Sequence, residues 1–265
     1  MLFSLHAKHV GRRNGNSAVA AAAYRSGEKL INECDGLAHD YAYRDDVVHT
    51  EIMLPDNAPE EFSDRSTLWN TAELAENRRD ARVALEIVVA LQREFSFETS
   101  LASVKAFVKN NFIQQGRCAD IAIHLGLSKD SSNVDSNLGK NFPHNPHAHI
   151  LLTTRSVCPS GLCDKKNPDW NKPYHLKQWR KDWADIQNRT FATKGLVARI
   201  SDASYKARGI DREPTKHLGP IFSTMERRGI QTDIGNINRE ITERNKERER
   251  KAQERVQRRR LELSR

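Results

Sequence analysis

Two short stretches in the middle of the chain alternate between polar and apolar residues. The first is Asp-Ile-Ala-Ile-His at 120–124, and the second is Pro-His-Ala-His-Ile-Leu-Leu-Thr-Thr-Arg at 146–155. Side chains at positions i and i+2 of a β-strand leave the same face, so His147 and His149 share one face and apolar residues take the other. We therefore predict strands at 117–124 and 146–155. Because only a loop separates them, we expect antiparallel pairing.

Apolar residues elsewhere in the first 200 positions recur either every second residue or every three to four residues. These patterns predict strands at 2–6, 47–54 and 81–91, and helices at 17–30, 66–78, 96–115 and 176–194. Ser17 suits a helix N-cap, and Gly116 and Gly195 follow helix ends. Trp179 and Trp183 lie on the apolar stripe of the last helix and are expected in the core. The order of elements predicts an α/β protein with one sheet flanked by helices, and the strand spacing also permits parallel crossovers.

Charge is concentrated at the C-terminus. The formal net charge is +8, and residues 239–265 alone hold eleven Lys/Arg and six Glu. From residue 236 onward the chain is almost uniformly polar, which fits a surface helix, a disordered tail or the start of a linker. The total charge is therefore weak support for a polyanionic partner, because a charged terminal helix is usually only solvated.

Composition argues against a membrane protein and against export. No stretch approaches the run of about 20 apolar residues that spans a bilayer, and the N-terminus lacks a signal-peptide pattern. The chain has four cysteines, which is sparse for 265 residues and favours a reducing cytoplasm. Cys158 and Cys163 flank Pro-Ser-Gly-Leu, which is more typical of a turn than of a zinc site.

Three histidines make a candidate metal site. If the strands at 117–124 and 146–155 are neighbours, His124 joins His147 and His149 on one sheet. His144 is a rival third ligand, although it lies in a predicted loop. Nitrogen ligands disfavour a site dedicated to magnesium or calcium and favour manganese, zinc, nickel or cobalt. Structural, hydrogen-bonded histidines are the alternative interpretation.

Tyr24 has unusually small neighbours on its predicted helix. Ala20, Ala21 and Gly27 occupy the positions three to four residues away, so a reactant can approach the ring. A phenol, whose reference pKa is about 10, is a poor nucleophile unless a cation assists the reaction. Taken alone, Tyr24 is more typical of a structural residue. Beside a three-histidine metal site, it is a candidate nucleophile, with Tyr41 and Tyr43 as substitutes.

Several separated motifs resemble, in the same order, the MobA/MobL-type relaxases, which are plasmid mobilisation proteins of the class named for a His–hydrophobe–His motif. The matching segments are Ser17–Leu30, Glu51–Pro55, Glu86, His124, Asn145–His149, Trp179–Trp183, Ser204–Tyr205, Glu213–Pro220 and Met225–Ile230. The likeness covers about residues 1–235. It implies a single relaxase-type domain with a mainly antiparallel central sheet, and the polar C-terminal stretch adds a charged helical tail. The predicted divisions are a catalytic core at 1–200, a C-terminal part at 201–235 and a tail or linker at 236–265.

The resemblance also implies an activity and a set of roles. Tyr24 would attack one strand of single-stranded DNA at an origin of transfer, and His124, His147 and His149 would bind a divalent metal ion. Manganese is preferred for that ion, with magnesium, zinc, nickel and cobalt as alternatives. Glu86 would orient one imidazole.

Further roles and partners follow from the same resemblance. Arg25 and Lys216 are candidate DNA contacts, and a solvated helix residue is the alternative for Arg25. Expected partners are an origin hairpin, accessory mobilisation proteins and a secretion coupling protein, with no membrane insertion and a location in the bacterial cytoplasm. A replication initiator or transposase of the same chemistry and a non-catalytic DNA-binding module are the alternative functions.

Overall fold

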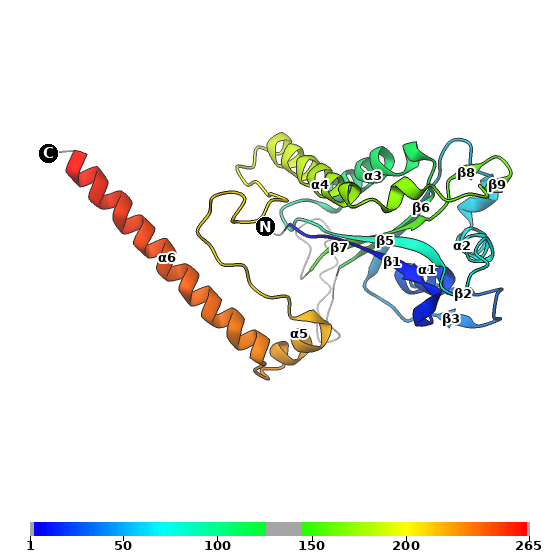
Figure 1. Cartoon of the computed structure of the whole chain (residues 1–265), viewed down its shortest axis with the longest axis horizontal. Helices are drawn as coiled ribbons and strands as arrows, with labels where there is room; N and C mark the ends of the chain where they lie inside the picture. The colour runs from blue at the N-terminus through cyan, green and yellow to red at the C-terminus, as the bar shows by residue number, and fades with distance from the viewer. Residues whose placement is uncertain (1–2, 126–144, 264–265) are drawn as a thin grey trace. The chain divides into compact units, whose positions relative to one another are not determined.

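A five-stranded antiparallel sheet forms the centre of the first part of the chain (Figure 1). The computed structural model describes residues 3–125 and 145–263. The strands are β1 (Leu5–Gly11), β4 (Val47–Met53), β5 (Arg82–Ala90), β6 (Ala119–His124) and β7 (His147–Thr153), in the spatial order β1-β5-β7-β6-β4. Every pairing is antiparallel, which confirms the prediction for β6 and β7. The parallel crossovers that the strand spacing permitted are not used in this sheet.

Alternation along the strands divides the sheet into two apolar faces, each covered by helices (Figure 1). One face packs against α3 (Phe97–Asn111) and α4 (Pro173–Thr193) and includes the fully buried Trp183. The other packs against α1 (Ala18–Ser26) and α2 (Arg65–Leu74). Most of the α1 alanines are buried in this second core cluster. The expected core position of the α4 tryptophans is confirmed.

Most predicted elements exist, with changed ends. The first strand was predicted at 2–6, and this position was wrong, because the strand is β1, Leu5–Gly11. The exposed Lys8 and His9 interrupt its hydrophobic pattern, which an edge strand tolerates. The first helix is capped by Ser17, whose Oγ accepts from the Ala20 N–H, but it ends at Ser26. Gly27 then adopts the left-handed conformation, with φ of 69°, and the chain turns into a small hairpin of β2 (Lys29–Ile31) and β3 (Ala38–Asp40).

Helix α2 stops earlier than its apolar pattern predicts because arginines from elsewhere take its terminal carbonyls. Arg12 donates to the carbonyls of Glu73 and Glu76, and Arg155 donates to that of Ala75. Arginine donors at a helix C-terminus satisfy carbonyls that have no partner within the helix. Cys158 and Cys163 lie at a second hairpin, β8 (Val157–Cys158) and β9 (Gly161–Leu162), which confirms the turn interpretation.

The chain divides into two compact units, Met1–Asp202 and Ala203–Arg265. The second unit contains α5 (Gly219–Arg227) and α6 (Asp233–Leu263), so the polar C-terminal stretch is a helix. Two asparagines of α6 hold the extended segment before α5: Asn245 pairs with the backbone of Glu213, and Asn238 pairs with the backbone of Lys216. Within the described part of the chain, every helix is too short or too polar to cross a membrane.

Candidate metal and nucleophile site

The three predicted histidines meet at one end of the sheet. His124 ends β6 and pairs in register with His147, which begins β7, and His149 lies two residues further along the same face. Their ring centroids are 4.6–5.3 Å apart. One ligand nitrogen from each residue lies within 4.8 Å of the others, a spacing that one metal ion can bridge. His144, the rival ligand, lies outside the described residues.

Each ring has one nitrogen held by an acceptor, which fixes the tautomer. Nε2 of His124 lies 2.7 Å from the carbonyl oxygen of Arg25, and Nδ1 of His147 lies 2.7 Å from that of Asn145. Nδ1 of His149 lies 2.7 Å from a carboxylate oxygen of Glu86. Because carbonyl and carboxylate oxygens only accept, these nitrogens carry the proton and the opposite nitrogen of each neutral ring keeps a lone pair.

Burial keeps two of the imidazoles in the neutral form that a metal requires. Burial, followed by the charge of His149, lowers the pKa of His124 to about 4. Burial also lowers the pKa of His149 below its ordinary value. Three histidines whose ligand nitrogens lie this close together fit a divalent transition-metal ion, because imidazole nitrogen is a preferred ligand of such ions.

Glu86 is a buried carboxylate that holds one of the three histidines, His149, in place. Its side chain is 1% exposed, and one carboxylate oxygen accepts from both His149 and Arg25, at 2.7 and 2.6 Å. Nζ of Lys8 lies 3.0 Å from the other oxygen. Burial alone would raise the pKa of Glu86, but the hydrogen bonds from His149 and Arg25 hold it well below its ordinary value. The carboxylate therefore stays charged and fixes one imidazole ring.

Arg25 is not the solvated helix residue that was considered for it. Its side chain is buried, pairs with Glu86 and also donates to the carbonyl of Ala21. The predicted DNA contact by Arg25 stays a prediction. Lys216 belongs to the second unit, where its backbone is bonded to Asn238. A DNA contact by Lys216 likewise stays a prediction.

Tyr24 projects from α1 with 44% of its surface exposed. Its small neighbours on α1 leave the ring accessible, but other segments approach it. The Arg44 guanidinium lies 4.2 Å from the ring centroid, and the Tyr41 ring packs edge-on at 5.2 Å. Tyr43, the other substitute considered, is 74% exposed and contacts Tyr41 instead.

Arg44 is the feature of this site that the sequence did not predict. One nitrogen of its guanidinium lies 3.4 Å from Nδ1 of His124, and another donates to the backbone carbonyl of Tyr24. Asp46 fixes the group with two hydrogen bonds of 2.9 and 2.7 Å. No local sequence pattern pointed to Arg44: the pairing of β4 with β6 sets Val47 opposite His124 and so brings the residues before β4 to the histidines.

A groove runs beside Tyr24, along the start of α1 and the edge strand β1. Its volume is about 530 Å³, and Lys8, Ser17, Arg25 and Tyr41 line it together with Tyr24. Arg25, which lines the groove, also contacts the histidine site: its side chain pairs with Glu86, and its carbonyl oxygen lies 2.7 Å from Nε2 of His124.

An antiparallel sheet with helices on both faces, three imidazoles at one end and an accessible tyrosine beside them define a relaxase-type α/β domain. The chain belongs to the MobA/MobL family, whose sequence model matches residues 16–228. It is 32% identical over 246 residues to the mobilization protein MobL of Acidithiobacillus ferridurans, across 86% of this chain and 64% of that protein. It is 29% identical over 282 residues to the probable mobilization protein MobA of Bifidobacterium longum, across 91% and 47% respectively.

A solved structure has the same fold. It is described as "Molecular Basis of Vancomycin Resistance Transfer in Staphylococcus aureus", and it aligns with a TM-score of 0.67 and 29% identity over 77% of this chain and all of that one. The chain spans between about half and two thirds of the length of the two curated relatives. The family and the fold predicted from the sequence motifs are thus confirmed.

Proposed function

We propose that this chain is a DNA relaxase that nicks one strand of single-stranded DNA at an origin of transfer, so that a plasmid can be mobilised. The supporting observation is that a single guanidinium, that of Arg44, contacts both the ring of Tyr24 and His124 of the histidine cluster. An accessible phenol and a metal-binding group therefore lie on the same side of the sheet. Family membership supports the same proposal.

In this proposal Tyr24 is the nucleophile. Its phenol oxygen attacks the scissile phosphorus and loses its proton, the bond to the 3′-oxygen breaks, and that oxygen takes up a proton. The products are a 5′-phosphotyrosine link and a free 3′-hydroxyl. One phosphodiester replaces another, so the reverse reaction rejoins the strand without a nucleoside triphosphate.

His124, His147 and His149 would hold a divalent ion, for which manganese is our preferred candidate. When bound, the ion supplies Lewis-acid chemistry at the phosphate oxygens. Glu86 and the carbonyls of Arg25 and Asn145 fix the three rings before any ion binds. Arg44 would give up its contact with Nδ1 of His124 and present its charge to the phosphate beside Tyr24.

We place this chemistry in the unit that ends at Asp202. The assignment of 201–235 to the relaxase domain and of the tail to linkage stays a prediction. So do the origin hairpin, the accessory mobilisation proteins, the secretion coupling protein and a cytoplasmic location.

A covalent-adduct assay tests the proposal. The chain is incubated with Mn²⁺ and single-stranded oligonucleotides tiled across the origin region of its own replicon, and the products are separated on denaturing gels. We expect a protein–DNA adduct that chelator prevents and that Tyr24→Phe abolishes, whereas the matched control Tyr43→Phe retains it. An adduct that survives Tyr24→Phe would assign the nucleophile elsewhere. DNA binding without an adduct on any oligonucleotide would favour a non-catalytic binding module.

A genetic assay separates a relaxase from a replication initiator or transposase of the same chemistry. A non-mobile plasmid carrying the nicked sequence should be mobilised in trans by the wild-type chain and not by Tyr24→Phe. Nicking without mobilisation, accompanied by plasmid replication, would favour the initiator.

A further inference from the structure

A second group of cations lies at the opposite end of the sheet from the histidines. They line a small pocket between β1, the start of β5 and the segment that carries a short 3-10 helix, Pro168–Asn171. The residues that matter for its chemistry are His9, Arg82, Leu85, Arg117, Lys166 and Trp170. The distance from His149 to Thr154, which also lines the pocket, is roughly 16 Å along an extended strand. The pocket is therefore separate from the site described above.

Arg117 forms the buried wall of this pocket. Its side chain is 2% exposed, and its guanidinium lies 4.6 Å from the ring centroid of Trp170. Nε donates to the carbonyl of Thr153 at 2.8 Å. Among residues 3–125 and 145–263, no carboxylate pairs with Arg117, and burial lowers its pKa to about 9. An uncompensated buried guanidinium is costly, so an anionic ligand at this position would stabilise the folded chain.

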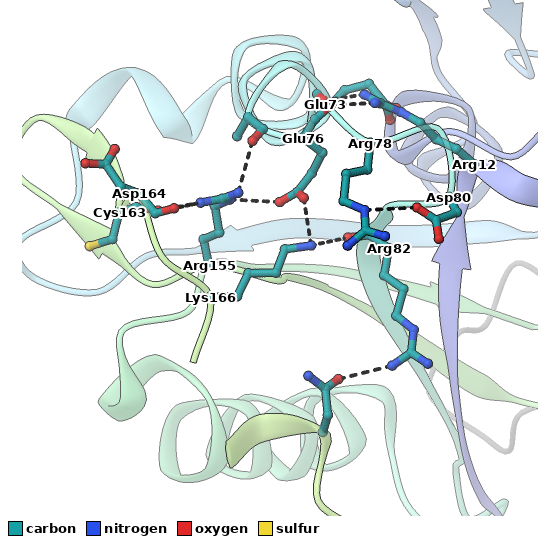
Figure 2. Close-up of polar contacts among 12 residues, drawn as sticks. Arg12, Glu73, Glu76, Arg78, Asp80, Arg82, Arg155, Cys163, Asp164 and Lys166 are labelled. Atoms are coloured by element: carbon teal, nitrogen blue, oxygen red, sulfur yellow. Dashed lines mark hydrogen bonds and ion pairs between the residues drawn. The ribbon is translucent and has the colours of Figure 1, made fainter. Parts of the chain in front are cut away.

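The other cations of the pocket are also poorly neutralised. Arg82 reaches only the amide oxygen of Asn171, at 3.4 Å, within the described chain. Lys166 pairs with Glu76, but that carboxylate is shared with Arg155 (Figure 2). Three cations thus face a pocket whose described lining residues include no carboxylate.

The pKa of His9 reflects the positive electrostatic potential of these three cations. Burial, followed by the charges of Arg82, Arg117 and Lys166, lowers the pKa of His9 to about 4. The three cations thus add to the effect of burial in disfavouring a proton on His9, which lines the pocket. The potential that disfavours a proton on His9 favours an anion.

We infer that this pocket binds a small dianionic oxyanion, a phosphate or sulfate group, between Arg117 and Arg82. The fork of N–H donors on a guanidinium matches the oxygens of such a group, and Trp170 fixes the plane of Arg117. Water-sized molecules can reach about 40 Å³ of the pocket, which suits one small anion or a few water molecules. The inference is independent of the proposed nicking reaction.

A titration with inorganic phosphate tests the inference. The 265-residue chain is studied in EDTA, so that no metal ion at the histidines binds phosphate, and its thermal midpoint is compared in phosphate and in chloride at equal ionic strength. We expect phosphate to raise the midpoint, with a Kd measurable by calorimetry. Arg82→Met and Arg117→Met should each weaken that Kd by about tenfold or more, because each removes charge-assisted hydrogen bonds.

Lys165→Met is the matched control, since it removes an exposed cation beside Lys166 that does not line the pocket. It should leave the Kd for phosphate unchanged. If Arg117→Met does not fold, the exposed Arg82→Met decides the test. Equal midpoints in phosphate and chloride, or a wild-type Kd in the folded variants, would overturn the inference.

The source of the oxyanion is decided by competition. A single-stranded oligonucleotide that displaces phosphate from the wild-type chain would identify the ligand as a phosphate group of a nucleic-acid backbone. Additive binding of oligonucleotide and phosphate would identify it as a free phosphate or sulfate.

Discussion

The two ends of the sheet both gather positive charge, but they compensate it differently. At the histidine end, Arg25 pairs with the buried Glu86, and Arg44 pairs with Asp46. At the opposite end, Arg117 is buried more deeply than either arginine, and its guanidinium meets only a carbonyl and two aromatic rings within the described chain. An internal carboxylate holds side chains in place before a ligand arrives. A buried cation without such a carboxylate leaves part of its stabilisation to a ligand.

Of the substitutions considered for the two ends, removing a histidine should have the largest effect, on metal binding and DNA cleavage. We expect His149→Ala to abolish metal binding and DNA cleavage while the chain keeps most of its DNA affinity, because that affinity comes chiefly from backbone contacts. Metal binding is measured by calorimetry with Mn²⁺, and DNA affinity by fluorescence anisotropy at fixed salt. His49→Ala, whose histidine pairs with Glu51 outside the cluster, is the control and should behave as wild type. Unfolding of the His149→Ala variant would indicate a structural histidine instead.

Two matched arginine substitutions test whether compensation differs between the ends. Arg25→Met removes a partner of the buried Glu86 and should lower the free energy of unfolding by about 3 kcal/mol. Arg117→Met removes a buried cation that lacks a carboxylate and should change that free energy by about 1 kcal/mol or less in phosphate-free buffer. Urea denaturation of both variants gives the two values. Equal losses would contradict the asymmetry between the ends.

Glu86→Gln tests whether the negative charge of Glu86 contributes to metal binding at the histidine end. The amide oxygen can still accept from Nδ1 of His149, but the negative charge that fixes and polarises the ring is lost. We expect Mn²⁺ affinity to fall by about 10- to 100-fold. Calorimetric titration measures the change, with the exposed Glu94→Gln as the control. An unchanged Mn²⁺ affinity would mean that the charge of Glu86 serves only its ion pair with Arg25 and does not support metal binding.

The sequence was sufficient for the parts of the site that depend on local periodicity. The alternation in Pro-His-Ala-His-Ile fixes His147 and His149 on one face whatever the strand pairs with. A single loop between two strands made the antiparallel pairing of β6 and β7 predictable, and with it the place of His124. Ser17 and the alanines of α1 likewise specify a capped helix that leaves Tyr24 accessible.

The remaining features depend on contacts between residues far apart in the sequence, and only the tertiary structure decided them. The pairing of β4 with β6 brings Arg44 between Tyr24 and His124, and no local pattern encodes that pairing. Arg117 looked like an ordinary residue at the start of a strand, yet packing of the segment around Trp170 buries it without a carboxylate. Local periodicity determines which face a side chain takes, whereas the cost of burying its charge depends on neighbours that only the folded chain supplies.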